Sequence, residues 1–163
     1  VTMISNLDSM RFMIKGADRF CKLASFNPDF RFRIIGKLSS EVLHKIQKLE
    51  LSNIELIGEV EFASKEFDQY LLESMYIAQF SRYESFGAAV IDGAIRGCHP
   101  LVSDQSALQE LVGPEMGRVI TDVNQLKLSD PKENPEVISH YFNEKFALTK
   151  REQRLIEIIS AMH

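Results

Sequence analysis

The sequence predicts an α/β protein with a three-layer, Rossmann-like fold, in which a doubly wound parallel sheet of about six strands carries helices on both faces. Short apolar segments and amphipathic segments alternate about six times along the 163 residues. Because parallel strands need crossover connections, this alternation with short loops favours a parallel sheet covered by helices. The length suits one domain with a sizeable core, and no internal repeat interrupts it.

In the first half, the strands are predicted at residues 1–5, 31–36 and 54–58. Apolar residues at helical spacing predict a helix from Ala17, and proline at Pro28 ends it. Ser39 and Ser40 are suitable caps for a second helix, and a third surrounds Phe67. We expect residues 6–16 to form a loop.

In the second half, the strands are predicted at residues 75–80, 99–103 and 117–122. A helix starts at Gly87, and Ser106 with Gln109 forms a capping box for the next one. After a polar loop over residues 123–134, Pro135 suits the first position of a helix. A second capping box at Thr149 and Glu152 opens a final helix.

Composition narrows the class of protein. Hydrophobic residues make up 45% and charged residues 26%, as in soluble globular proteins. No apolar run approaches the ~20 residues of a membrane-spanning helix. The net charge of -4, without a basic stripe, argues against nucleic-acid binding. The two cysteines, Cys21 and Cys98, favour free thiols in a reducing compartment, and none of the four histidines has metal-ligand spacing.

A ligand site is predicted at the carboxyl ends of the strands, where sheets of this kind bind ligands. Four segments belong to that edge: residues 6–16, 36–37, 58–60 and 81–87. Glu84 stands directly before the helix that begins at Gly87. A helix start favours anions, so Glu84 and Asp92 are expected to hold a polar ligand whose anionic part lies on that helix end.

The residues of this stretch resemble the core of family 4 glycosyltransferases of the GT-B fold. Five anchors fall in register without a gap: Glu84-Ser85-Phe86-Gly87, Asp92, Gly97, Ser103-Asp104 and Glu110. Upstream, Lys15-Gly16-Ala17-Asp18 and the segments ending at Gly36 and Val60 also fit the family. The resemblance covers nearly the whole chain. It implies that residues 1–163 form the C-terminal, nucleotide-sugar-binding GT-B domain, and that the N-terminal acceptor-binding domain is absent from this sequence.

The resemblance also implies roles for single residues. The ammonium of Lys15 would neutralise the diphosphate of the donor, with Arg11 as a second cation. Glu84 would accept hydrogen bonds from the sugar, and Asp92 from the ribose. The remaining donor-binding residues are Val60 beside the base, and Ser85, Phe86, Gly87 and Ala88 at the helix start. Lys15 and Glu84 are the two expected catalytic residues.

The sequence departs from the family pattern at two of these places. The family usually has a glutamate where Asp92 stands, so the ribose contact is shifted or water-mediated. The arginine that commonly follows the first strand is Asn6 here, and the loop from there to Lys15 is longer. Arg11 is the candidate substitute for that arginine.

Taken as a family member, the chain would belong to a retaining glycosyltransferase of the hexosyltransferase type that needs no metal or other cofactor. It would move a sugar from a nucleotide-diphosphate sugar to a glycan or lipid-linked acceptor in surface polysaccharide biosynthesis. We expect a cytoplasmic protein that touches the inner face of the membrane through its missing half. The isolated domain would bind donor without transferring the sugar.

Two other functions remain open from the residues. One is a UDP-sugar epimerase or phosphorylase domain of the same fold, for which a catalytic carboxylate pair or a cofactor lysine is expected. The other is a non-catalytic, Rossmann-like module whose donor site has decayed, which the departures at Asn6 and Asp92 would explain.

Overall fold

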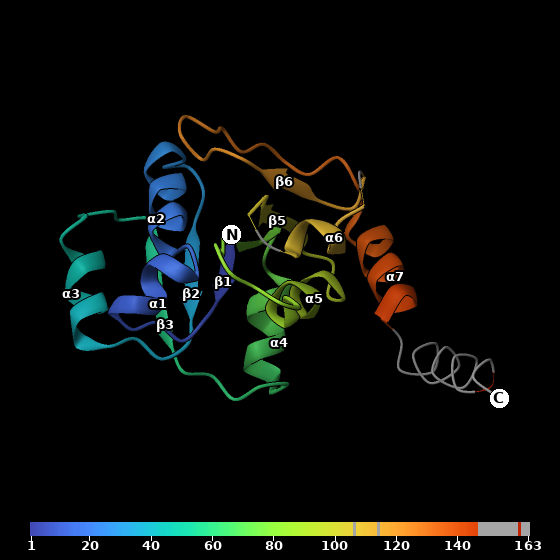
Figure 1. Cartoon of the computed structure of the whole chain (residues 1–163), viewed down its shortest axis with the longest axis horizontal. Helices are drawn as coiled ribbons and strands as arrows, with labels where there is room; N and C mark the ends of the chain where they lie inside the picture. The colour runs from blue at the N-terminus through green and yellow to red at the C-terminus, as the bar shows by residue number, and fades with distance from the viewer. Residues whose placement is uncertain (106, 114, 147–159, 161–163) are drawn as a thin grey trace.

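The computed structural model describes residues 1–105, 107–113, 115–146 and 160 (Figure 1). Within these residues, six strands form one parallel sheet in the order β3-β2-β1-β4-β5-β6. The strands are β1 (Thr2–Ile4), β2 (Phe32–Ile35), β3 (Ile54–Gly58), β4 (Tyr76–Gln79), β5 (His99–Ser103) and β6 (Arg118–Ile120). This topology confirms the predicted doubly wound sheet.

Seven helices lie within the described residues. They are α1 (Ser9–Ile14), α2 (Ala17–Phe26), α3 (Ser40–Gln47), α4 (Lys65–Leu72), α5 (Ala88–Ala94), α6 (Leu108–Leu111) and α7 (Pro135–Phe146). Ser39 caps α3 and Ser64 caps α4, each through its hydroxyl oxygen. Pro135 is the first residue of α7, as predicted. The predicted capping box at Ser106 and the final helix from Thr149 rest on residues outside the described ranges.

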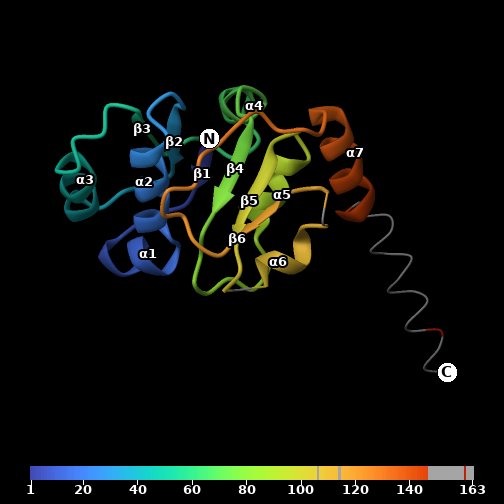
Figure 2. The ribbon, with the colours of Figure 1, turned by 90° about the horizontal axis from the view of Figure 1, so that it is seen from above.

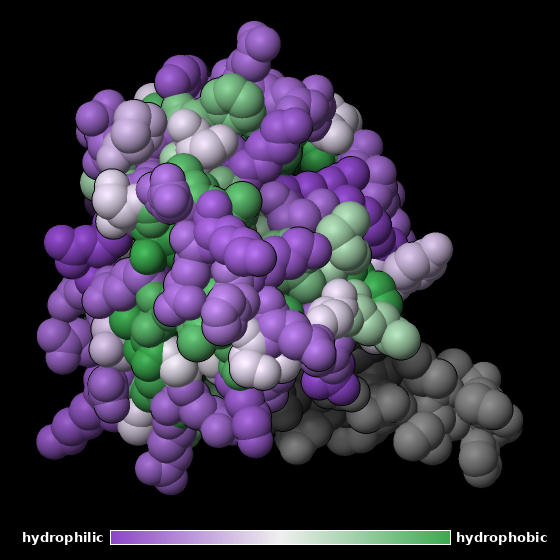
Figure 3. Space-filling view, turned by 90° about the vertical axis from the view of Figure 1, so that its left-hand side faces the viewer, coloured by the Kyte–Doolittle hydropathy of each residue, from purple (hydrophilic) through white to green (hydrophobic). Residues whose placement is uncertain are grey.

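The sheet separates two apolar clusters, because alternate strand residues point to opposite faces. On one face Met3 and Tyr76 pack with residues of α1, α2 and α3. On the other face Ile77 and Val102 pack with α4, α5 and α6. Figure 1 shows α1, α2 and α3 grouped on one side of the molecule and α7 on the opposite side. The face nearest α3 is dominated by hydrophilic residues, with smaller hydrophobic areas between them (Figure 3).

The segment predicted as a loop over residues 6–16 contains helix α1. Asp8 caps this helix, because its Oδ1 accepts a hydrogen bond of 2.7 Å from the backbone N–H of Arg11. Phe12 is the one buried residue of α1, whereas Met10 and Met13 are 73% and 44% exposed. A six-residue helix with a single buried side chain leaves no apolar periodicity in the sequence, so the prediction missed it.

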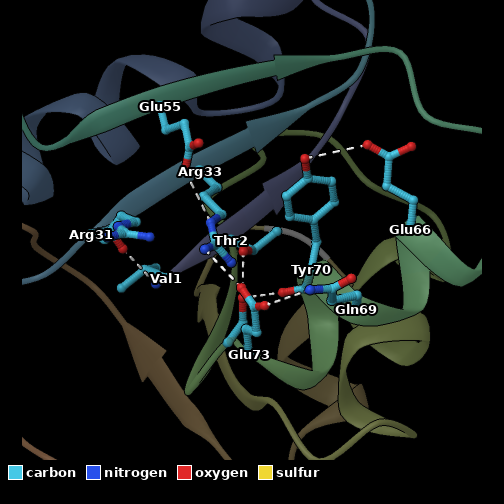
Figure 4. Close-up of polar contacts among 10 residues, drawn as sticks. Val1, Thr2, Arg31, Arg33, Glu55, Glu66, Gln69, Tyr70 and Glu73 are labelled. Atoms are coloured by element: carbon cyan, nitrogen blue, oxygen red, sulfur yellow. Dashed lines mark hydrogen bonds and ion pairs between the residues drawn. The ribbon is translucent and has the colours of Figure 1, made fainter.

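At the amino-terminal edge of the sheet, the buried Arg33 of β2 joins three elements. Its guanidinium group donates to Glu55 of β3 at 3.1 Å and to Glu73 at the end of α4 at 2.9 Å. It also lies 5.4 Å from the centre of the Tyr70 ring. Figure 4 shows these side chains converging on Arg33. The network holds α4 against β2 and β3, away from the carboxyl ends of the strands.

At the carboxyl ends, the turn between α1 and α2 touches the backbone that follows β4. Gly16 has a φ of +75°, and a Cβ atom there would lie 2.1 Å from the carbonyl oxygen of Phe80. The backbone N–H of Arg82 donates to the carbonyl oxygen of Ile14 at 2.8 Å. Figure 2 shows the arrow of β4 pointing toward the side on which α1 and α6 lie. This contact places Lys15 beside the loop that carries Glu84.

Replacing Gly16 with alanine is expected to lower the free energy of unfolding by about 2–4 kcal/mol, because backbone strain and a clash with Phe80 act together. Urea unfolding at constant m-value measures this loss. Gly58→Ala is the matched control, since Gly58 has a φ of +86° but no atom within 4 Å of the added Cβ. It should cost only the ~1–2 kcal/mol of strain. Equal losses in the two variants would contradict the close contact.

Candidate functional site

Lys15 and Glu84 form an ion pair at the carboxyl edge of the sheet. Lys15 is the C-cap of α1, and Glu84 lies in the loop between β4 and α5. The Lys15 Nζ lies 2.8 Å from the Glu84 Oε2, and the two side chains are 31% and 14% exposed. The sequence predicted both residues for one site, and the structure brings them into direct contact.

The Glu84 carboxylate is held by several donors. Its Oε2 accepts hydrogen bonds from Lys15 and, at 2.7 Å, from the Nε2 of Gln79, while its Oε1 accepts from the backbone N–H of Ser85 at 3.2 Å. Burial raises the pKa of Glu84, but Lys15 and the backbone N–H groups of Phe86 and Ser85 outweigh burial, so the pKa lies below its usual value. Glu84 is therefore an ionised hydrogen-bond acceptor at neutral pH.

A second ion pair joins the same two segments. Arg82 donates to both carboxylate oxygens of Asp18, at 2.9 and 2.8 Å, and also to the carbonyl oxygen of Met13. A two-point contact of this kind fixes both distance and orientation. Burial raises the pKa of Asp18, but the hydrogen bond from Arg82 outweighs it and the pKa is lowered. The Arg82–Asp18 pair thus fixes the start of α2 relative to the loop after β4.

An open pocket of about 500 Å³ surrounds the ion pair, and it is lined by Lys15, Arg82, Tyr83, Glu84, Ser85 and Gln105. A cavity of similar volume, about 540 Å³, lies at the opposite edge of the sheet beside Arg33 and Glu73. Size does not choose between them. The first pocket is favoured because it lies at the carboxyl edge, where sheets of this kind bind ligands, and because Lys15 presents a cation there next to an ionised acceptor. In the other pocket Arg33 is buried and already paired with Glu55 and Glu73.

The helix-start residues lie beside this pocket. Ser85 lines it, and Phe86 is 55% exposed with its ring edge-on to Phe146. Gly87 directly precedes Ala88, the first residue of α5. A Cβ on Gly87 would lie 2.4 Å from a methyl carbon of Leu108, so α6 packs against this turn. The predicted contacts of these four residues with a ligand stay predictions.

Asp92, Arg11 and Val60 are not among the residues that line the pocket around the Lys15–Glu84 pair. Asp92 is on α5, and burial raises its pKa while Arg96 offsets part of that rise. Arg11 lines a separate cavity of about 250 Å³ with Asn6 and Lys37. Val60 packs against the apolar cluster beneath α4 and α5. Arg11 lies one turn before Lys15, whose backbone N–H donates to the carbonyl oxygen of Arg11 at 2.8 Å, and its role as a second cation stays a prediction.

Sequence reasoning missed Gln79 and the pairing of Arg82 with Asp18. Gln79 could have been noticed as a polar residue in the otherwise apolar segment that leads to Phe80. Asp18 belongs to a stretch that fits the family pattern and Arg82 lies two residues before another, but 64 residues separate them. The pairing of β1 with β4 and the contact of Gly16 with the Phe80 backbone bring them together.

In the described part of the chain, no cluster of three or more histidine, cysteine or acidic residues could hold a metal ion. The same described residues include no helix with the length and apolar character needed to cross a membrane.

Fold and site together define an α/β protein with a polar, cation-containing pocket at the carboxyl edge of a doubly wound sheet. Residues 8–159 match the family model described as glycosyl transferases group 1. The match spans most of the chain, so this protein belongs to that family, as its motifs predicted. Comparison with curated proteins gives no significant match.

Two solved structures illustrate the similarity of fold. Alr3699/HepE of Anabaena in complex with UDP has a TM-score of 0.76 and 18% identity, over 98% of this chain and 48% of that chain. AviGT4, a glycosyltransferase involved in avilamycin A biosynthesis, has a TM-score of 0.75 and 16% identity, over 96% and 49%. Other structures of HepE contain UDP with glucose, or UDP-glucose. The chain spans about half the length of these proteins.

The Arg82–Asp18 pair is expected to contribute about 1 kcal/mol of coupling in a double-mutant cycle of Arg82→Met and Asp18→Asn near neutral pH. The pKa of Asp18 lies below its usual 3.8 in the folded protein, so the coupling is present above that value. It is lost as the pH falls through the folded-state pKa. Urea unfolding at both ends of this range measures it, and a coupling that persists in acid would refute the ionic contact.

Proposed function

We propose that this chain is the donor-binding half of a retaining glycosyltransferase that uses a nucleotide-diphosphate sugar. The observation that carries the proposal is the Lys15–Glu84 pair, which lies in an open pocket at the sheet edge within the family-matched segment. The solved relatives that share the fold include complexes with UDP and UDP-glucose, and their chains are about twice as long. The bound ligands support a nucleotide-sugar donor for this chain. The greater length of those proteins supports a second domain that binds the acceptor.

In this proposal, Lys15 acts on the leaving group. When the bond between the anomeric carbon and the diphosphate oxygen breaks, its electron pair stays on that oxygen and negative charge grows on the diphosphate. The Lys15 ammonium stabilises the growing charge, the kind of electrostatic contribution that is often the largest in catalysis. The backbone N–H groups of Phe86, Gly87 and Ala88 would add to it. This chemistry needs no metal ion.

Glu84 binds the sugar in the same proposal. An ionised carboxylate is an acceptor only, so it suits the hydroxyl groups of a hexose. Asp92 would take the ribose hydroxyls and Val60 would lie beside the base. The N-terminal GT-B domain would hold a glycan or lipid-linked acceptor on the side from which the leaving group departs, which gives retention. We place the enzyme in the cytoplasm, in surface polysaccharide assembly.

Titration calorimetry with UDP-, GDP- and ADP-linked sugars tests the donor site. Lys15→Met is expected to weaken the binding of the nucleotide diphosphate and of its sugar by about 10-fold or more, because a charged hydrogen bond is lost. Glu84→Gln should weaken only the sugar nucleotides. Lys22→Met, at an exposed lysine of α2, is the matched control and should bind as the wild type does. Absence of binding to every nucleotide tested would favour a non-catalytic module.

The 163-residue chain is expected to bind its donor and to transfer no sugar, because the acceptor cleft needs the second domain. The full-length enzyme should give a product with the anomeric configuration of the donor. Proton NMR of the first product formed distinguishes retention from inversion. Transfer by the isolated chain, or an inverted product, would overturn the corresponding part of the proposal.

A further inference from the structure

Gln79 is a buried polar residue next to the candidate site to which the proposed function assigns no role. It is the last residue of β4 and is 6% exposed, between Ala78 and Phe80, which are each 1% exposed. Its Nε2 donates to Glu84 Oε2 at 2.7 Å and to the hydroxyl oxygen of Ser81 at 3.1 Å. Its Oε1 is buried and has no hydrogen-bond partner among the described residues.

An amide whose Nε2 is hydrogen-bonded while its buried Oε1 is not lowers the stability of the fold. A buried acceptor without a partner loses its hydrogen bonds to water and regains none, so native proteins hold few such groups. The neighbours of Gln79 in β4 are apolar, and an apolar side chain would avoid the loss. A glutamine that keeps an unpaired acceptor in this place therefore points to a function for its donor end, the contact with Glu84.

Lys15 and Gln79 donate to the same oxygen of Glu84, but their side chains differ in how far they can move. Lys15 is a long, 31% exposed side chain that lines the pocket, so its ammonium can turn to an anion that enters. Gln79 is buried at the end of β4, so its amide cannot turn toward the anion with Lys15. When Lys15 moves to a diphosphate, the Glu84 Oε2 keeps Gln79 as its remaining side-chain donor, and the Oε1 keeps the N–H of Ser85.

We propose that Gln79 is a positioning residue that holds the Glu84 carboxylate toward the sugar of the donor after Lys15 has turned to the diphosphate. The inference rests on the proposed function and extends it. It predicts that Gln79 matters for the sugar part of the ligand and hardly for the nucleotide part. It also predicts that the protein does not need the Gln79 amide for its stability.

The test compares Gln79→Met with the wild type in calorimetric titrations of UDP and UDP-glucose, or of whichever nucleotide pair the wild type binds best. Loss of a hydrogen bond to a charged group should weaken UDP-glucose binding about 10-fold, while the affinity for UDP stays within about two-fold. The melting temperature should be unchanged or higher. Gln69→Met is the matched control, because Gln69 also donates to a carboxylate, that of Glu73 at 3.0 Å, but on the exposed face of α4. It should leave both affinities unchanged.

Gln79→Glu adds a second readout that does not depend on the methionine variant folding. Two carboxylates in contact share one proton at low pH, and the shared proton restores a donor to Glu84. UDP-glucose binding by this variant should therefore be stronger near pH 5 than near pH 8. The wild type should not strengthen in this way. The other titratable or charged side chains that line the pocket, Lys15, Arg82 and Tyr83, are the same in both proteins.

The possible results distinguish failure of the Gln79 inference from failure of the proposed function. Unchanged UDP-glucose binding by Gln79→Met would overturn the inference. Equal loss of UDP and UDP-glucose together with a lower melting temperature would also overturn it, because Gln79 would then support the fold alone. A wild type that binds neither nucleotides nor nucleotide sugars would instead remove the proposed function, and the inference with it.

Discussion

The contact between Gly16 and the backbone of Phe80 is the constraint on which the carboxyl edge of this protein depends. It leaves no room for a side chain at residue 16, and it sets the distance between the α1–α2 turn and the loop after β4. Lys15 and Glu84 can pair at 2.8 Å because their backbones are already held together by this contact. If the two residues lay on long, unconnected loops, pairing would cost side-chain and backbone entropy. That cost would exceed the small free energy that a part-exposed ion pair contributes.

Three ionic groups illustrate how position separates structural from functional charge. Arg33 is buried between two glutamates and a tyrosine ring, and its Nε and Nη2 both donate to carboxylates. Arg82 donates to both carboxylate oxygens of Asp18, a contact that suits a structural role in holding two segments together. Among the described residues the Lys15 ammonium has one hydrogen-bond partner, Glu84, and its side chain reaches the open pocket. Of the three, Lys15 can exchange its partner for an anion at the lowest cost.

The strands and their parallel arrangement could be predicted because each strand is a short apolar segment and the alternation with helices implies parallel pairing. The Lys15–Glu84 site followed from the family motifs and from the rule that ligands bind at the carboxyl ends of strands. Helix α1 could not be predicted, since its stability comes from the Asp8 cap and the burial of Phe12. In this helix Arg11 lies one turn before Lys15 and lines a cavity with Asn6 and Lys37, which a loop of unknown shape could not reveal.

The environments of the two acids differ in a way that sequence alone does not show. Glu84 has a lowered pKa because Lys15 and backbone N–H groups surround it, so it is ready to accept hydrogen bonds in the free protein. Asp92 has a raised pKa because it is half-buried. Its neighbour Arg96 donates to Asp68 and to the backbone carbonyl of Asp92.

A ligand with hydroxyl groups would supply the donors that favour the ionised form of Asp92, so binding should lower its pKa toward the usual value. In the proposed donor complex the two acids would contribute at different moments: Glu84 is organised before the ligand arrives, and Asp92 would gain its partners from the ligand itself. In that proposal, an aspartate at position 92, where the resemblance implies a glutamate, would change the reach of the carboxylate more than its chemistry.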